Sequence, residues 1–419
     1  MTNKNLNNFL NPKSIAIIGA SNTEGKVGNS LMKNLKEFKG KVIPVNIHDK
    51  KVLGVKTYKS ILEYKDKIDL VVIATPKETV NSILEECGKK GIASVIIITS
   101  GFSEVKNYDL EEQIIKTAKK CNINFLGPNC FGVANPYINL DTTFANKTAK
   151  KGNIAFISQS GALWSYISDV SSSDHIAFSG FVSLGNMAGL DFSDFIEYFS
   201  KDKTTKKIIL YIEKLRDGKK FINACRKATK AGKEIIAIKA GKSEKGKEAA
   251  ISHTGSLATD YEIYKGAFKQ AGVKLAESFS EAFNLKHETL KVKGKKVFII
   301  TNAGGAGALM ADFCDENGLT LVEPPEKLKL QNPLDILGTA KAEDYEKALS
   351  SVANENFYDL IIVILTPQKM AQPEETAEAI VKFSKQTKKQ VIAYFLGEDS
   401  VKNAKKILQD SKIQVYENL

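Results

Sequence analysis

The stretch SIAIIGASNTEGKVG, residues 14–28, joins a short apolar run to a glycine-rich segment and then to a predicted helix. Gly19, Gly25 and Gly28 leave room for the backbone to approach a phosphate, and main-chain N–H groups at a helix start favour anions. The spacing is not GxGxxG, and no carboxylate directly ends the next apolar run, so the signature of an NAD site is absent. The stretch therefore predicts a strand, a turn and a helix that bind a nucleotide-like ligand, with a ligand-free turn as the alternative.

The apolar run of residues 14–20 is the first of five in this third of the chain. The others are KVIPVN (41–46), DLVVIAT (69–75), SVIIITS (94–100) and INFLGPN (123–129). Gly, Pro, Ser or Asn bounds each run, and segments of helical length lie between them. Continuous apolar strands with helical crossovers predict a parallel sheet covered on both faces. Lys50 and Lys51 follow the second run and suit a ligand with an additional phosphate.

Length and composition narrow the classes of function. The 419 residues predict two or three domains, and the net charge of +12 comes from lysines spread along the chain. Aromatic residues do not interleave with basic clusters, which favours a polyanionic small ligand over nucleic acid. No run approaches the ~20 apolar residues of a membrane helix, and the N-terminal residues lack a signal-peptide pattern. The five cysteines are scattered, which argues against disulfides or a zinc site and indicates a reducing, cytoplasmic protein without a metal.

An internal repeat occupies the remainder of the chain. GNIAFISQSGAL (152–163) aligns with KKVFIITNAGGA (295–306), KKIILYIEKL (206–215) with YDLIIVILTPQ (358–368), and GKEIIAIKAG (232–241) with KKQVIAYFLG (388–397). Three matches in one order predict two copies of a doubly wound α/β unit. We expect domains at residues 1–147, 148–290 and 291–419. Glu213 and His253 lie in the first copy, and the second copy has no glutamate or histidine at the corresponding places.

Three elements of the first copy follow predicted strands: the SQSG segment (158–161), Glu213, and EAAISHTGSLATD (248–260), which contains His253. The carboxyl ends of parallel strands meet in one crevice. The helix start at SQSG can hold a phosphate, and a second helix is expected to begin in the Thr-Gly-Ser that follows His253. Small neighbours and two helix starts suit a phosphohistidine whose other ring nitrogen donates to Glu213. A structural loop histidine, a zinc ligand and a hydrolase base remain alternatives for His253, and a solvated carboxylate for Glu213.

The motifs together resemble the α subunit of ADP-forming acyl-CoA synthetases, the acetate–CoA ligase branch of the succinyl-CoA synthetase superfamily. The matching segments are IIGASNTEGKVGNSLMKNL, GKVIPVN, GFSE, GPNCFGV, GNIAFISQSGAL, FVSLGNMAGLDFSDFIEYF, LYIEKLRDGKKF, KAGKS, SHTGSLA, TNAGGAG and NPLDILG. The resemblance implies an α/β protein with an N-terminal Rossmann-like CoA-binding domain followed by two flavodoxin-like doubly wound parallel-sheet domains. It also implies the reaction acyl-CoA + ADP + phosphate ⇌ carboxylate + CoA + ATP.

The resemblance assigns roles residue by residue. His253 matches the histidine that takes the phosphoryl group, and Glu213 the glutamate that steadies it. The residues matching the phosphate-holding helix starts are Ser158, Gln159, Ser160, Gly161, Thr254 and Gly255. The residues expected to bind CoA are Gly19, Ala20, Ser21, Asn22, Lys26, Val27, Lys50, Thr99, Ser100 and Asn129.

The same family places ATP or ADP and Mg²⁺ on an ATP-grasp domain that we do not find in this sequence. The resemblance therefore implies an ATP-grasp β subunit as partner, in an α2β2 assembly. Residues 242–257 are expected to form a mobile loop, since one histidine must serve both the acyl phosphate and the nucleotide. The runner-up hypothesis is a CoA- or acyl-CoA-sensing regulatory module without ligase activity of its own.

Overall fold

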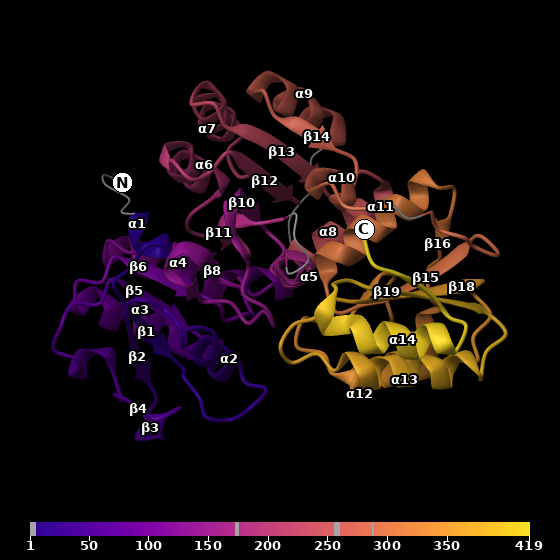
Figure 1. Ribbon diagram of the computed structural model, residues 1–419, viewed down its shortest axis with the longest axis horizontal. Coiled ribbons are helices and arrows are strands. Elements are labelled where there is room, and N and C mark those ends of the chain that lie inside the picture. The colour runs from indigo at the N-terminus through magenta and orange to yellow at the C-terminus, as the bar shows by residue number, and fades with distance from the viewer. Residues whose placement is uncertain (1–5, 172–175, 255–259, 287–288) are drawn as a thin grey trace.

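The computed structural model describes residues 6–171, 176–254, 260–286 and 289–419, with the backbone alone for residues 251–254. The chain forms three units, each built on a mainly parallel sheet flanked by helices (Figure 1). In the view of Figure 1 the first unit lies at the left and the third at the right, with the second unit above them, and Asn34 of the first unit contacts Lys369 of the third. Among the described residues no helix is both long and apolar enough to cross a membrane.

The first sheet contains the five predicted strands, all parallel, in the order β2-β1-β5-β6-β7. Its elements are α1 (Asn7–Leu10), β1 (Ser14–Ile18), α2 (Val27–Asn34), β2 (Lys41–Val45), the hairpin of β3 (Lys51–Val52) and β4 (Val55–Lys56), η1 (Ile61–Glu63), β5 (Leu70–Ile73), α3 (Lys77–Lys89), β6 (Ser94–Ile97), η2 (Ser103–Val105), α4 (Tyr108–Lys120) and β7 (Asn124–Leu126). Every residue of β1, β5 and β6 is buried. This burial explains their continuous apolar sequence, because helices cover both faces of a parallel sheet.

The second sheet has the order β14-β13-β12-β10-β11-β8-β9. Its elements are β8 (Val133–Asn135), η3 (Pro136–Ile138), β9 (Leu140–Asp141), β10 (Lys151–Ser158), α5 (Ala162–Val170), β11 (Phe178–Ser183), α6 (Phe192–Lys201), β12 (Lys207–Ile212), α7 (Gly218–Lys230), β13 (Glu234–Lys239), α8 (Glu244–Thr254), α9 (Tyr261–Ala271), β14 (Lys274–Ala276) and α10 (Phe279–Phe283). The sheets change earlier than the expected boundary at residue 147. Strand β8 already pairs antiparallel with β11, where it covers an edge that would otherwise present unpaired backbone groups.

The third sheet is parallel, with β17 added beside β15. Its elements are β15 (Lys296–Thr301), α11 (Gly304–Glu316), β16 (Thr320–Leu321), η5 (Glu326–Leu328), β17 (Leu334–Asp335), α12 (Ala342–Val352), β18 (Leu360–Leu365), α13 (Pro373–Ser384), β19 (Gln390–Phe395), η6 (Asp399–Val401), α14 (Lys402–Asp410) and β20 (Gln414–Tyr416). The order β20-β19-β18-β15 reproduces β14-β13-β12-β10 of the second sheet. The repeat predicted from the sequence is therefore confirmed at the level of strand order.

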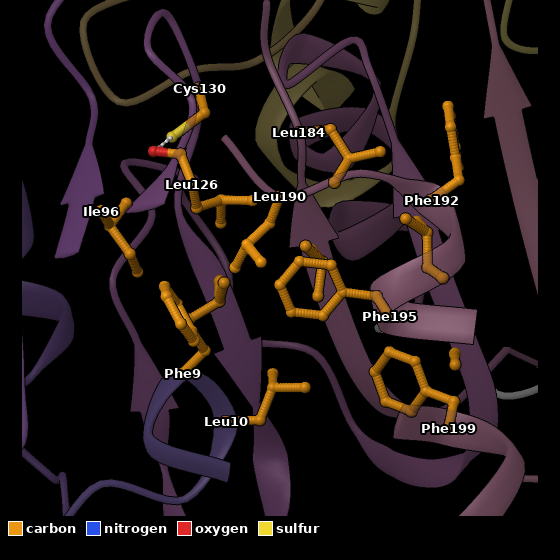
Figure 2. Close-up of a cluster of buried hydrophobic side chains, with 14 of the residues drawn as sticks. Phe9, Leu10, Ile96, Leu126, Cys130, Leu184, Leu190, Phe192, Phe195 and Phe199 are labelled. Atoms are coloured by element: carbon orange, nitrogen blue, oxygen red, sulfur yellow. Dashed lines mark hydrogen bonds between the residues drawn. The ribbon is translucent and has the colours of Figure 1, made fainter. Parts of the chain in front are cut away.

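One hydrophobic cluster joins the first two units (Figure 2). Phe9 of α1 meets Phe195 of α6 edge to face, with ring centroids 6.1 Å apart. Leu126 at the end of β7 and Leu190 before α6 belong to the same cluster. Because this core is continuous, the carboxyl edge of the first sheet is held in a fixed relation to the second sheet.

A buried carboxyl group, Asp141 of β9, lies at the junction of all three units. Its Oδ1 accepts hydrogen bonds from the Thr143 amide at 2.9 Å and the Thr143 hydroxyl at 2.6 Å. Nearby, Asn34 of α2 donates to the Thr143 carbonyl at 2.8 Å and accepts from Lys369, which follows β18, at 2.6 Å. Burial raises the pKa of Asp141 from 3.8 to about 7, although Thr143 and the Lys369 ammonium oppose the shift.

We expect Asp141→Asn to stabilise the protein at pH 8 and to have little effect near pH 4. The raised pKa means that the folded state binds this proton more tightly, so the associated stability is present below pH 4 and is lost as pH rises through 7. Asparagine stays neutral, which should gain roughly 4 kcal/mol at pH 8. Chemical denaturation of both proteins at several pH values measures the difference, and a difference independent of pH would contradict the prediction.

Candidate active site

The predicted CoA-binding residues lie along the carboxyl edge of the first sheet. Gly19, Ala20 and Ser21 follow β1, and Thr99 and Ser100 follow β6. The Thr99 hydroxyl donates to the Thr75 carbonyl, after β5, at 2.8 Å. Three adjacent strand ends are thereby brought together, as expected for the ligand crevice of a parallel sheet.

Two glycines of the first turn allow close packing of the backbone, whereas room for a phosphate was the expected reason for all three. A Cβ on Gly28 would lie 1.9 Å from the carbonyl oxygen of Gly19, and one on Gly19 would lie 2.5 Å from that of Ala74. Both glycines are thus required for close packing of the turn on its neighbours. Only Gly25, with φ +81° and nothing within 4 Å of an added Cβ, faces open space.

Asn22 ties this turn to the β3–β4 hairpin. Its Nδ2 donates to the Lys51 carbonyl at 2.8 Å and to Asp49 at 3.1 Å, and its Oδ1 accepts from the Leu53 amide at 3.0 Å. Lys26, which precedes α2, and Lys50 are both exposed, whereas Val27, the first residue of α2, is partly buried. Two exposed ammonium groups therefore flank the edge where a phosphate-bearing ligand is predicted.

The GPNCF segment connects this edge with the second sheet. The Asn129 amide donates to the Thr99 carbonyl at 2.9 Å, and its side chain donates to Asn186 of the second unit at 3.2 Å. Phe131 packs on Gly161, where an added Cβ would lie 2.3 Å from that of the phenylalanine. Two residues of chain span at most ~7 Å. The predicted CoA edge and the predicted phosphate site are therefore neighbours.

The SQSG segment carries buried polar side chains directly before α5. The Ser158 hydroxyl donates to the Ser160 carbonyl at 2.6 Å, and Gln159 Oε1 accepts from the Glu213 amide at 2.7 Å and the Lys214 amide at 2.9 Å. Gln159 Nε2 and the Ser160 hydroxyl are buried and have no hydrogen-bond partner among the residues that the structure describes. A buried polar group without a partner is costly, so these two atoms indicate a place for a ligand.

The second copy shows the same turn with its amide fully paired. Asn302 stands where Gln159 stands in the first copy. Its Nδ2 donates to the Thr366 carbonyl and to Gln368 Oε1, each at 2.9 Å, and its Oδ1 accepts from the Thr366 amide at 2.9 Å. The two copies of the turn thus differ in their side-chain amide: its nitrogen has hydrogen-bond partners in the second copy and none among the described residues in the first.

Glu213 follows β12 and is only 6% exposed. Lys239, at the end of the adjacent β13, is 3% exposed and lies over the Tyr264 ring, with Nζ 4.6 Å from the centroid. Burial lowers the pKa of Lys239 to about 8, against the opposing charges of Asp312 and Glu213. A buried lysine therefore shares the end of the sheet with the candidate glutamate.

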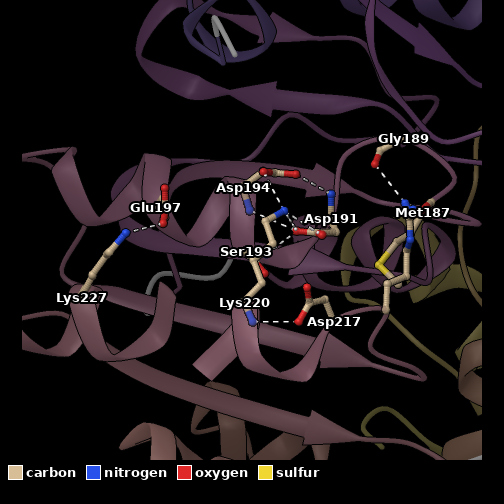
Figure 3. A network of polar contacts seen from close by, with 10 residues as sticks. Met187, Gly189, Asp191, Ser193, Asp194, Glu197, Asp217, Lys220 and Lys227 are labelled. Carbon is tan, nitrogen blue, oxygen red and sulfur yellow. Dashed lines mark hydrogen bonds and ion pairs between the residues drawn. The ribbon is translucent and has the colours of Figure 1, made fainter. Parts of the chain in front are cut away.

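The segment after Glu213 is fastened to the β11–α6 loop. Arg216 donates to the Gly189 carbonyl at 3.0 Å and also to the Met187 carbonyl. Lys220 pairs with Asp191 at 2.9 Å and Asp194 at 3.0 Å, the two carboxylates that cap α6 (Figure 3). Because this loop also carries Asn186, the Glu213 segment and Asn129 are held by one polar network.

The segment around His253 differs from the expected loop. Residues 244–254 form α8, so His253 and Thr254 are its last two residues, and the rest of the Thr-Gly-Ser segment where a second helix was expected to begin lies outside the described residues. The side chains of His253 and Thr254, and Gly255 altogether, lie outside the described residues. The expected mobility of residues 242–257 stays a prediction.

The second helix start beside the SQSG turn belongs to α11. A Cβ on Gly305 would lie 2.5 Å from the Ser160 hydroxyl, and the Tyr211 hydroxyl donates to the Gly305 carbonyl at 3.1 Å. A cavity of about 120 Å³ separates Ala249 of α8 from Gly304, the first residue of α11. Since His253 is four residues beyond Ala249, the end of α8 reaches about 6 Å past this helix start. Two helix N-termini, α5 and α11, therefore meet near the end of α8.

Sequence reasoning missed Lys239, Tyr211 and the start of α11. The repeat contained a usable signal for α11, because its first glycines align with the SQSG turn. Lys239 could have been found as the single charge in an otherwise apolar strand end. The described residues contain no group of three or more His, Cys, Asp or Glu suited to a metal ion.

Comparison with known proteins agrees with this architecture. The family described as CoA binding domain matches residues 13–136, and the succinyl-CoA ligase-like flavodoxin domain matches residues 151–287. The chain is thus a CoA-binding protein of the succinyl-CoA ligase-like class, with a further parallel sheet. The chain belongs to the family of the alpha subunits of ADP-forming acetate–CoA ligases, as its relatives show.

Two of these relatives are archaeal ligases. The chain is 42% identical to the alpha subunit of acetate–CoA ligase (ADP-forming) II of Pyrococcus furiosus, covering 98% of this chain and 94% of that one. It is 46% identical to the ADP-forming acetate–CoA ligase of Methanocaldococcus jannaschii, covering 97% of this chain and 60% of that longer protein. Acetyl-coenzyme A synthetase 1 of Ca. Korarchaeum cryptofilum, solved with phosphate and ADP, is 35% identical with a TM-score of 0.64, covering 99% and 93% of the two chains.

Proposed function

We propose that this chain is the catalytic alpha subunit of an ADP-forming acyl-CoA synthetase that works through a phosphohistidine at His253. The reaction is acyl-CoA + ADP + phosphate ⇌ carboxylate + CoA + ATP. The observation that carries the proposal is the pair of unused buried donors, Gln159 Nε2 and the Ser160 hydroxyl, at a meeting of two helix N-termini. An anion between the starts of α5 and α11 would satisfy both donors and both helix dipoles.

The site supports three balanced transfers. Phosphate attacks the thioester carbonyl, CoA leaves as the thiol, and an acyl phosphate remains. The neutral His253 imidazole then attacks phosphorus, the carboxylate leaves, and the other ring nitrogen keeps its proton toward Glu213. ADP finally takes the phosphoryl group from His253 and becomes ATP. Helix N-termini and buried donors stabilise the phosphoryl charge in the first two transfers.

CoA is proposed to bind along the carboxyl edge of the first sheet, with its phosphates near Lys26 and Lys50. The thioester would then reach the SQSG turn across the Asn129–Phe131 bridge. The substrates are small carboxylic acids or their CoA esters, with acetate as the first candidate because the relatives are named acetate–CoA ligases.

An ATP-grasp beta subunit is the proposed partner, binding ADP and Mg²⁺ in an α2β2 assembly. The support is that relatives of matching length are named alpha subunits, while the Methanocaldococcus jannaschii protein extends beyond the matched 60%.

Reconstitution tests the proposal. The chain is mixed with the ATP-grasp protein encoded beside it or purified with it, and ATP formation from acetyl-CoA, ADP and phosphate is measured. We expect ATP only when both proteins are present, together with CoA release in equal amount. CoA binding by this chain without any ATP formation, over a panel of acyl-CoA esters, would favour a sensing module and contradict the proposal.

A further inference from the structure

The helix that carries His253 is anchored by a carboxylate from the other copy of the repeat. Asp312 of α11 is 3% exposed and accepts hydrogen bonds from the amides of Gly241, Lys242 and Ser243 at 2.7, 2.9 and 2.8 Å. It also accepts from the Ser243 hydroxyl at 2.9 Å. The same hydroxyl accepts from the Gly246 amide at 2.9 Å, which makes Ser243 the cap of α8. The loop directly before α8, residues 241–243, is thus held by four hydrogen bonds to one carboxylate, and the Ser243 cap links this loop to the first turn of α8.

The reciprocal contact exists across the same interface. Asp169 of α5 is fully buried and accepts from the Glu398 amide at 2.7 Å, the Ser400 amide at 3.1 Å and the Ser400 hydroxyl at 2.8 Å. Asp169 is eight residues after Gly161, and Asp312 is eight residues after Gly304. The two loops also correspond, since one follows β13 and the other β19. Each copy therefore binds a loop of the other copy through one buried aspartate, and the two aspartates are related by a pseudo-twofold axis.

The two loops lead to different elements. The loop held by Asp312 opens α8, whereas the loop held by Asp169 opens η6 and α14. One contact therefore bears on the helix that carries His253 and its mate bears on α14, although their chemistry and burial are alike.

A glycine shows that the Asp312 contact is close-fitting. A Cβ on Gly246 would lie 1.9 Å from Asp312 Oδ1. Other restraints on this turn are the ion pairs of Lys242 with Glu277 at 2.7 Å and Glu316 at 3.1 Å, whose carboxylates are exposed. Ion pairs with exposed partners hold geometry weakly, so the buried carboxylate fixes the direction in which α8 leaves the sheet.

We propose that Asp312 is a positioning residue for phosphoryl transfer, which sets the place of His253 by fixing the first turn of α8. The inference rests on the proposed function of His253. His253 is nine residues after Glu244, so its Cα lies about 14 Å along the helix from the anchored turn. A tilt of about 4° at that turn moves His253 by about 1 Å, and a misplacement of that size can lower a catalysed rate about 100-fold.

Asp312→Asn and its mate Asp169→Asn test the proposal in the complex reconstituted with the ATP-grasp partner. We expect both to lower Tm by similar amounts, because each leaves the same kinds of donors poorly paired. Asp312→Asn should lower kcat about 10- to 100-fold with KM for CoA within about twofold, and Asp169→Asn should keep kcat within about threefold. Equal losses of kcat in the two variants, or an unchanged kcat in Asp312→Asn, would overturn the proposal.

Ser243→Ala and Ser400→Ala form a milder pair, in case an aspartate variant does not fold, and Ser243→Ala also removes the hydroxyl that accepts from the Gly246 amide. Each removes one hydroxyl donor to its aspartate. We expect a loss of kcat of about three- to tenfold in Ser243→Ala alone.

Hydrogen exchange provides a readout that does not depend on activity. Protection of the α8 amides should fall in Asp312→Asn and stay at the wild-type level in Asp169→Asn. Unchanged α8 protection would overturn the proposed anchoring even if the wild-type complex made no ATP. Reduced protection with no phosphate incorporated at His253 in the wild type would instead retain the anchoring and reject the proposed function.

Discussion

His253→Ala is expected to abolish ATP formation and all transfer of phosphate between the nucleotide and acyl phosphate sites. The reason is that the proposed mechanism passes each phosphoryl group through this imidazole, so its removal cannot be offset by better binding elsewhere. The loss should exceed about 10⁴-fold in kcat, the scale seen when a covalent nucleophile is removed. Incubation of the reconstituted complex with labelled ATP and Mg²⁺ measures it directly. Wild-type alpha chain should carry acid-labile label, and the variant none.

Two controls separate a lost nucleophile from a lost fold. The affinity of the variant for CoA should stay within about twofold of wild type, because none of the residues expected to bind CoA is altered. The melting temperature should also change little, since α8 is held at its other end by Asp312. Equal acid-labile label on both alpha chains would show that another residue takes the phosphoryl group.

The sequence was sufficient to predict most of the strands and the repeat. Runs such as those ending at Ile18 and Ile97 are apolar throughout because both faces of their strands are covered. This pattern can be recognised from the local sequence alone. Glu213 was recognisable for the same reason, as a charge directly after such a run.

Other features depend on contacts between segments far apart in sequence. Strand β8 joins the second sheet because β11 has an edge to cover, and no local pattern states which sheet accepts a three-residue strand. The segment before His253 was expected to be a loop because its composition is rich in small residues and lysine. It forms α8, and the loop from which α8 begins is held by Asp312, some 70 residues away, through the amides of residues 241–243.

The Asp169–Asp312 pair was predictable from the sequence only in part. Both residues occupy the same place in the repeat, so the alignment contained their correspondence. Their role required the structure, because each carboxylate acts on the opposite copy and the pattern of one copy alone cannot reveal it.

Glu213→Gln is expected to lower kcat for ATP formation about 100-fold while KM for CoA stays within about twofold. Glutamine keeps the size of the side chain and leaves the backbone bonds of residue 213 to Gln159 in place. What it removes is the negative charge proposed to orient the His253 ring and to stabilise it as phosphorus is attacked. The effect should therefore fall on the rate of His253 labelling in a single turnover, and much less on binding.

The matched control for this variant is Glu234→Gln, on the neighbouring strand at the opposite end of the sheet. Glu234 pairs with Lys274 at 2.7 Å and Lys207 at 3.6 Å at the surface. Loss of such exposed pairs should change stability by about 1 kcal/mol or less and leave kcat within about twofold. The two substitutions are chemically identical, so a difference in kcat between the variants is caused by the position of the glutamate in the structure. If Glu213→Gln labelled His253 at the wild-type rate, the carboxylate would be a structural feature of the strand end, and the orientation of the histidine would have to come from elsewhere.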